Sequence, residues 1–200
     1  MPLTRERIVA EALALLDETG LEGVSLRKLA TRLGIQAPTL YWYVRNKREL
    51  TGEMAEAILR PDLETLPEPK GTPWREWLLD AASRFRRALL SHRDGARIVA
   101  EAQRSTTMAD LTEHALSVLV EQGESVRQAR LLVLLVERFT LGLVLEEQSG
   151  QAEPHDVDRE ALAERYPLTT AGITEYFGTG ATVDDLFRHS VRLMLGATAP

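Results

Sequence analysis

Residues 25–47 contain two short helical patterns separated by a glycine, and this segment constrains the fold more than any other. After Ser25, a favourable N-cap, apolar residues recur at helical spacing until Gly34 ends the pattern. Pro38 suits the first turn of a second helix, because proline fixes φ near the helical value and lacks only an N–H that would have no partner. The segment therefore predicts a helix-turn-helix, whose second helix meets base edges in the major groove of DNA.

The charge distribution supports a DNA-facing surface in the same segment. The chain has 24 Lys and Arg residues and 30 Asp and Glu residues, a net charge of −6. Residues 25–48 contain no acid, and their cations are Arg27, Lys28, Arg32, Arg45, Lys47 and Arg48. One basic segment in an acidic chain favours a single DNA-facing surface over general polyanion binding. The charges alone would equally suit a solvated helix face, but the adjacent Tyr41-Trp42-Tyr43 favours DNA contact.

The length and composition are those of a globular protein with a sizeable core. The chain has 200 residues, of which 44% are hydrophobic. It has no cysteine, which excludes disulfides and thiolate metal sites. Because an amphipathic helix begins at Thr4, we expect no signal peptide and a cytoplasmic protein. The longest apolar run, 131–136, is far shorter than the roughly 20 residues that span a bilayer, so we expect no membrane partner.

Helical patterns cover nearly the whole chain and strand alternation is absent, so we predict an all-α fold. A proline-rich linker around Gly71 separates a small N-terminal unit from the rest, and 149–167 is expected to be a mobile loop with room for one turn of helix. Asn46 to Glu49 resembles a capping box. The expected helices are about 4–19, 25–33, a recognition helix from 38 through the Tyr-Trp-Tyr segment, 46–60, 74–91, 95–103, 106–122, 125–148, 168–177 and 182–196.

Helices 125–148 and 182–196 have unusually broad apolar surfaces. The first is apolar almost all round, so it must be covered on more than one side. A second subunit would supply that cover, and two central core helices of a monomer are the alternative. We favour a homodimer held by these two helices, because one recognition helix rarely gives enough affinity and helix-turn-helix proteins usually bind paired half-sites.

The N-terminal sequence resembles the DNA-binding domain of the tetracycline-repressor (TetR) family. The matching stretches are Arg5 to Gly20, Gly23 to Ala30, Leu33-Gly34 and Pro38 to Lys47, and residues 89–96 and 138–148 resemble the C-terminal domain of the tetracycline repressors themselves. The resemblance implies a ligand-responsive transcriptional regulator, a repressor released from its operator by an inducer. It also implies a three-helix helix-turn-helix DNA-binding domain in 1–46, a connecting helix and the start of the linker in 47–66, and a helical ligand-binding and dimerisation domain in 67–200.

Carried over by position, the resemblance places seven side chains against double-stranded operator DNA. Their chemistry suits that role, because arginine can bind guanine or phosphate, aromatic and threonine side chains can pack on thymine methyls, and lysine can hold phosphate. Ala37 stands where the tetracycline repressors have a glutamine that contacts adenine, so the operator sequence should differ. The seven residues are Arg27, Pro38, Thr39, Tyr41, Trp42, Tyr43 and Lys47.

The inducer site departs from the family pattern. Val99 replaces the metal-ligating histidine, and apolar residues replace three polar ligand contacts, whereas Phe85 and Glu146 persist. The histidines (92, 114, 155 and 189) have no metal-ligand spacing, so we expect no metal and no cofactor. A hydrophobic or aromatic inducer should occupy a cavity enclosed by helices 74–91, 95–103, 106–122 and 125–148. The candidate ligand-binding residues are Leu63, Ala81, Phe85, Val99, Ala102, Gln103, His114, Ala115, Leu134, Glu137 and Glu146.

Glu137 is an acid within the apolar stretch 134–139. One interpretation pairs it with an arginine (Arg104, Arg130 or Arg138), and the other gives it a part in ligand recognition. We slightly favour the ion pair, because an unpaired buried carboxylate is costly.

Two other classes of function compete with transcriptional regulation. An enzyme is disfavoured, because Ser91, His92 and Asp94 are too close in sequence to converge as a triad and better suit a helix–helix turn. No glycine-rich phosphate loop or paired-carboxylate arrangement stands out either. The alternative that we keep is a ligand-binding or protein-interaction dimer without DNA-binding activity.

Overall fold

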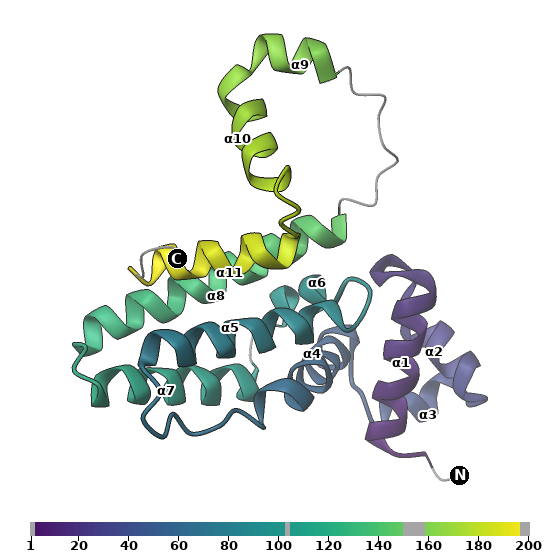
Figure 1. Ribbon diagram of the computed structural model, residues 1–200. Coiled ribbons are helices and arrows are strands. Elements are labelled where there is room, and N and C mark those ends of the chain that lie inside the picture. The colour runs from purple at the N-terminus through teal and green to yellow at the C-terminus, as the bar shows by residue number, and fades with distance from the viewer. Residues whose placement is uncertain (1–2, 103–104, 150–158, 197–200) are drawn as a thin grey trace.

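The computed structural model describes residues 3–102, 105–149 and 159–196, and within them it confirms the all-α fold (Figure 1). A single 3-10 turn, Leu21–Gly23, accompanies the α-helices, and no strand occurs in these ranges. The helices are α1 Arg5–Thr19, α2 Leu26–Leu33, α3 Ala37–Tyr41, α4 Lys47–Leu63, α5 Trp74–Leu90, α6 Gly95–Glu101, α7 Thr106–Glu121, α8 Val126–Ser149, α9 Arg159–Arg165, α10 Pro167–Phe177 and α11 Val183–Met194.

The recognition helix is shorter than the sequence predicted. Helix α3 ends at Tyr41, and Trp42 and Tyr43 lie in the turn that follows. The chain must turn here because Val44 is fully buried in the core and Asn46 already has the extended backbone of the α4 N-cap. The aromatic pair therefore projects from a turn instead of from a helix.

Two further boundaries differ from expectation. Helix α4 continues past Arg60 through Pro61 to Leu63, because a proline in the last turn removes a single N–H donor and the buried Leu63 favours one more turn. The segment expected to be a loop contains helix α9, while residues 150–158 lie outside the described part of the chain.

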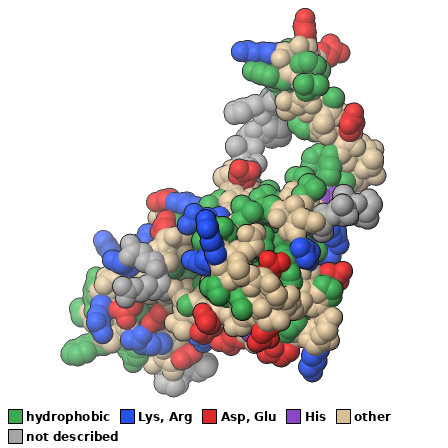
Figure 2. Space-filling view, turned by 90° about the vertical axis from the view of Figure 1, so that its left-hand side faces the viewer, with side chains coloured by type: hydrophobic (Ala, Val, Ile, Leu, Met, Phe, Trp, Pro, Cys, Tyr) green, Lys and Arg blue, Asp and Glu red, His purple; other side chains and the backbone are tan. Residues whose placement is uncertain are grey.

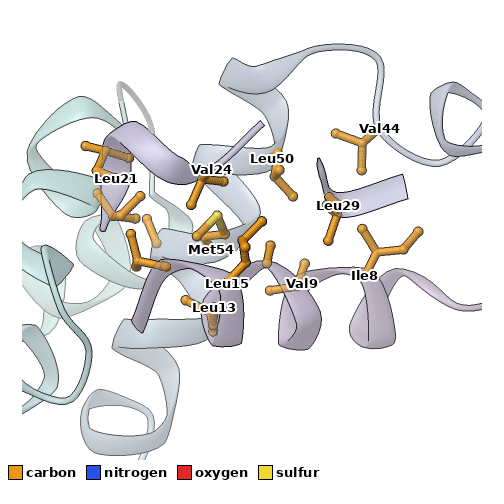
Figure 3. Close-up of a cluster of buried hydrophobic side chains, with 14 of the residues drawn as sticks. Ile8, Val9, Leu13, Leu15, Leu21, Val24, Leu29, Val44, Leu50 and Met54 are labelled. Atoms are coloured by element: carbon orange, nitrogen blue, oxygen red, sulfur yellow. The ribbon is translucent and has the colours of Figure 1, made fainter. Parts of the chain in front are cut away.

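One hydrophobic cluster holds the N-terminal helices together (Figure 3). Side chains of α1 point toward those of α2 and the first half of α4. Val44, which follows α3 in the chain, also belongs to the cluster. Ile98 of α6 is also fully buried in this cluster, although α6 follows the proline-rich linker. The N-terminal core therefore includes a residue from the second half of the chain. Its labelled members are Ile8, Val9, Leu13, Leu15, Leu21, Val24, Leu29, Val44, Leu50 and Met54.

The larger C-terminal part is built on two more clusters. One joins α5, α7, α8 and α11 around Trp77 and Phe187, and the other joins α4, α5, α6 and α8 around Leu59 and Phe85. Helix α4 contributes to both the N-terminal cluster and the second of these clusters. Helix α4 therefore belongs to the cores of both halves of the protein.

Helices α8 and α11 lie side by side on one face of the body, and α9 and α10 stand away from it (Figure 1). Among the described residues of α10 none is buried, and Leu168 is 88% exposed. Figure 2 shows hydrophobic side chains on this projecting arm. At the base of the arm, the Tyr176 hydroxyl and His189 Nδ1 are 2.6 Å apart, which ties α10 to α11. None of the described helices combines the length and the hydropathy needed to cross a membrane.

Candidate DNA interface and ligand pocket

The turn between α2 and α3 is formed by local capping. The Ser25 hydroxyl oxygen accepts a hydrogen bond from the Lys28 amide at 3.2 Å, which begins α2. Gly34 has the left-handed conformation, with φ 69° and ψ 29°, and the Ile35 amide donates to the Ala30 carbonyl at 3.0 Å. This C-terminal arrangement needs a residue that adopts positive φ without strain, as glycine does. It fixes the direction in which α3 leaves α2.

The structure brings the seven proposed DNA-contacting residues to one end of the molecule, and six of them are exposed. Trp42 is the most exposed of them, at 87%. Tyr43 is partly buried and packs against the N-terminal cluster, so it has a structural contact as well. Large aromatic side chains in solvent contribute no burial to the fold, which makes them available for a partner. The exposed residues are Arg27, Pro38, Thr39, Tyr41, Trp42 and Lys47.

One cation of the basic segment is not available to DNA. Arg32 forms ion pairs with Glu18 at 2.6 Å and with Glu11 at 2.9 Å, both on α1. The hydrogen bonds that Arg32 donates to Glu18, and then the one that it donates to Glu11, raise the pKa of the Arg32 guanidinium, and Arg32 in turn lowers the pKa of Glu18. Within the described part of the chain, four cations of the segment have no ion-pair partner: Arg27, Lys28, Lys47 and Arg48.

The start of α4 also differs from a reciprocal capping box. The Asn46 side-chain oxygen Oδ1 accepts from the Glu49 amide at 2.9 Å, as expected, but the Glu49 carboxylate accepts from the Arg45 amide at 2.8 Å. Lys47 is the first helical residue and is exposed. A helix N-terminus with an adjacent cation is well suited to a DNA phosphate.

A largely apolar pocket lies between α5, α7 and α8. Each of these helices presents residues at intervals of three or four, which places them on one face. The pocket has a volume of only about 30 Å³, far below the roughly 300–1,000 Å³ of typical ligand sites. It is therefore too small to hold such a ligand without widening. The lining residues are Leu78, Ala81, Ala82, Phe85, Met108, Leu111, Thr112, Ala115, Val133, Val136 and Glu137.

Only part of the predicted ligand set lines this pocket. Ala81, Phe85, Ala115 and Glu137 do. Six others lie elsewhere: Leu63 and His114 line an adjacent cleft, Val99 and Ala102 pack against the N-terminal cluster, Leu134 is half-buried on another side of α8, and Glu146 is exposed. The eleventh, Gln103, is outside the described residues.

The lining residues on α5 and α7, predicted and missed alike, follow a pattern that was visible in the sequence. On α5 they are positions 78, 81, 82 and 85, and on α7 they are 108, 111, 112 and 115. Both sets have the i, i+3, i+4, i+7 spacing of one helix face. The pattern marks a buried face, but it does not say which buried face surrounds a cavity.

Glu137 has no ion-pair partner among the described residues, which tests two of the three arginines that the sequence offered. Neither Arg130 nor Arg138 pairs with it, and Arg104 lies outside the described residues. Arg130 lies two turns from Glu137 on nearly the same face of α8, and both Arg130 and Arg138 are exposed, whereas Glu137 is half-buried and lines the apolar pocket. Its carboxylate has no hydrogen-bond partner among the described residues.

The loop between α5 and α6 connects the pocket side to the DNA-binding end. The Asp17 carboxylate at the end of α1 contacts His92 Nδ1 at 2.9 Å and accepts from the Arg93 amide at 3.0 Å. Asp94, in the left-handed conformation at φ 55°, accepts from the Leu21 amide at 2.8 Å. From the sequence we expected Ser91, His92 and Asp94 to form a helix–helix turn. The structure shows that this turn also binds the N-terminal helices.

A second link joins α4 directly to the start of α7. The Glu56 carboxylate accepts hydrogen bonds from the Thr106 amide at 2.7 Å, the Thr107 amide at 3.2 Å and the Thr107 hydroxyl at 2.6 Å. Partial burial alone would raise the pKa of Glu56, but these hydrogen bonds outweigh it and the pKa is lowered. The helix that carries Lys47 is therefore bonded to a helix that lines the pocket.

The described residues contain no group of three or more His, Cys, Asp or Glu side chains arranged to hold a metal ion. The position equivalent to the family's histidine ligand, Val99, is packed against hydrophobic residues. The donor set that binds a divalent metal is thus missing at this position.

Two family models together match most of the chain. Residues 8–54 match bacterial regulatory proteins of the tetR family, and residues 66–197 match the tetracyclin repressor-like C-terminal domain. Tetracycline repressor protein class D from Escherichia coli is 41% identical over 150 residues, which covers 75% of this chain and 69% of the relative.

Solved structures agree with these matches. A tetracycline repressor variant from Acinetobacter baumannii, in complex with minocycline, superposes with a TM-score of 0.80 at 32% identity, covering 98% of this chain and 92% of that one. BioQ with its double-stranded DNA operator has a TM-score of 0.66 at 31% identity, covering 75% of this chain and 90% of that one. The similarity extends to proteins seen with a drug and with an operator.

Proposed function

The chain belongs to the TetR family and is a ligand-responsive, DNA-binding transcriptional repressor, and we propose that its inducer is a small, largely hydrophobic organic molecule. The observation that supports this inducer class is the apolar lining of the pocket between α5, α7 and α8. The relatives are transcriptional regulators, not enzymes, and none of the findings favours a dimer that lacks DNA binding. An operator-binding repressor acts where the chromosome is, so we propose a cytoplasmic location.

The proposed DNA contacts are the seven residues assigned from sequence. Their support is their common position at one end of the molecule and the exposure of six of them. Lys47 is suited to a phosphate, whereas Arg27, Thr39 and Trp42 are suited to base edges. Ala37 is half-buried and apolar, so the proposed operator differs from that of repressors with a glutamine at this position.

We propose that the repressor is a homodimer held by α8 and α11. Leu131 and Leu135 on α8 and Leu193 on α11 are exposed, although the two helices lie side by side in one protomer. Exposed leucines on adjacent helices form a surface that a second copy can cover. The proposed dimer would present two recognition helices to half-sites about 34–36 Å apart, or a multiple of that distance.

Operator binding is tested with DNA from the promoter region beside the gene for this protein. Fluorescence anisotropy should show saturable binding that competitor DNA of unrelated sequence does not remove. A footprint should cover two half-sites. Equal affinity for promoter and unrelated DNA would contradict the assigned function, and a footprint over one unpaired half-site would contradict the homodimer.

Induction is tested with planar and polycyclic hydrophobic compounds, without added magnesium. An inducer must bind the low-affinity state better than the DNA-bound state, because equal affinity for both shifts no population. Phe85→Leu, which keeps an apolar side chain, should weaken the response and preserve binding of operator by the ligand-free protein. Tight induction by tetracycline that required magnesium would contradict the proposed loss of the metal site at Val99.

A further inference from the structure

Among the described residues that line the pocket, one is charged, and it has no partner in the described part of the chain. Glu137 lines a pocket whose other members are ten apolar or neutral residues. Its carboxylate is half-buried and forms no ion pair with any described residue. A carboxylate in apolar surroundings loses hydration, and the loss must be offset by a counter-charge or hydrogen bonds. The described lining of the pocket supplies no counter-charge. The hydroxyl of Thr112 is the one side-chain hydrogen-bonding group there besides Glu137.

The pocket adjoins a larger and acidic cleft. Leu111 lines both spaces, and the second cleft has a volume of about 250 Å³. Glu64, Glu68 and Asp110 lie on its exposed rim, and of these only Glu64 has an ion-pair partner, Arg60 at 2.9 Å.

His114 also lines this cleft, and its ring packs edge-on against Trp77 with 5.1 Å between centroids. Among the described residues, no Lys or Arg lines either the cleft or the pocket. A cleft with charges of mainly one sign concentrates ligands of the opposite sign.

Resting on the proposed function, we propose that the inducer is an organic cation with an aromatic or aliphatic body, such as a protonated amine, whose charge is bound by Glu137. The apolar body would fill the space next to Phe85 and Leu111, and the acidic rim of the cleft would attract the molecule. The pocket must widen to admit it, because the present volume holds only a few water molecules. Widening separates α7 from α5 and α8, and α7 is bonded to α4 through Glu56.

The test uses three probes that share one body and differ in charge: 1-naphthylmethylamine, 1-naphthylmethanol and 1-naphthoate. Calorimetry of the full-length protein at neutral pH should show the amine binding about tenfold or more tighter than the alcohol, as a hydrogen bond to a charged group predicts. The carboxylate should bind most weakly. In anisotropy measurements, the amine should release the promoter DNA at the lowest concentration.

Two variants identify the group responsible. Glu137→Gln preserves size and removes the charge, so the amine should lose its advantage over the alcohol while the ligand-free protein binds DNA unchanged. Glu113→Gln changes an exposed acid on α7 that lines neither space, and it should preserve the preference.

The proposal is overturned if the alcohol binds as tightly as the amine, if Glu137→Gln preserves the preference, or if none of the probes binds at millimolar concentration. Calorimetry needs no DNA, so a failure of operator binding would refute the proposed function and still leave the charge preference measured.

Discussion

The proposed DNA-contacting side chains come from residues 27–47 and, except for Tyr43, lie in solvent, whereas the pocket side chains come from three helices between residues 78 and 137 and are mostly buried. At the DNA end, each exposed side chain can be changed with little effect on packing. In the pocket, the residues that would contact a ligand also form the core. The exposed residues at the DNA-binding end can therefore serve recognition without stabilising the fold, whereas the pocket residues must do both.

The sharpest contrast is between two aromatic residues, and it gives the largest expected effect. Phe85→Ala should lower the free energy of unfolding by about 3–5 kcal/mol, because Phe85 is only 3% exposed and its loss leaves a cavity. Trp42→Ala should leave that free energy within about 0.5 kcal/mol of wild type, as surface substitutions do, but weaken operator binding. Urea unfolding and anisotropy measure the two quantities. Equal destabilisation by both substitutions would remove the contrast.

A charge on the proposed dimer surface should have the next largest effect. Leu193 is 65% exposed in the protomer, so Leu193→Glu should not unfold it, but a buried charge would weaken dimerisation and operator binding by about a hundredfold or more. Sedimentation should show monomers at micromolar concentration. Val120→Glu, an exposed apolar position on α7, is the matched control. Leu143 is less suitable, because it packs against the core of its own protomer. A stable wild-type monomer would contradict the dimer.

A phosphate contact at the DNA end should produce a smaller and sequence-independent effect. Lys47→Ala should weaken binding to specific and unrelated DNA alike and lower the slope of log K against log salt by about 1. Titrations at several salt concentrations measure the slope. Lys70→Ala, an exposed cation of the linker, should leave it unchanged. An unaltered slope for Lys47→Ala would place this residue away from the phosphates.

Loss of the Glu56 carboxylate, which joins α4 to the start of α7, should give the smallest effect. The pKa of Glu56 is lower when folded, so its carboxylate stabilises the fold above its ordinary value near 4.5, and that contribution is lost as the pH falls through the folded pKa. Glu56→Gln should therefore cost at most about 1 kcal/mol at pH 7, because the carboxylate is partly solvated, and less near pH 4. Urea unfolding at several pH values tests this, with Glu121→Gln as the control. A difference that grows toward pH 4 would contradict the assigned sign.

The contrast also explains what sequence could predict. The helix-turn-helix depends on neighbours in the chain, namely the Ser25 cap and the glycine turn at Gly34, and its exposed residues were assigned from that segment. The termination of α3 at Tyr41 was missed, because it depends on Val44 reaching the core. The pocket depends on how three distant helices face one another, so the helix periodicity identified buried faces without locating the cavity.

Glu137 shows the same limit for charges. The sequence offered Arg104, Arg130 and Arg138 as partners, but Arg130 and Arg138 are exposed and form no ion pair with Glu137, although Arg130 lies two turns away on nearly the same face of α8. The ion pairs of Arg32 with Glu11 and Glu18 were missed for the related reason that the partners lie on α1. Ion pairs between helices depend on how the helices pack, and the sequence of a single helix does not show which residues of another helix will face it.

The burial of Ile98 in the N-terminal cluster limits how this protein can be recombined with its relatives. A chimera joined at the proline-rich linker would combine a DNA-binding unit with a foreign α6, and the side chain at position 98 would have to fit a core that it did not evolve with. The exchangeable unit is therefore discontinuous in sequence: the N-terminal helices together with α6. Transplanting operator specificity into another repressor requires moving both segments or choosing a donor with a similar residue at this position.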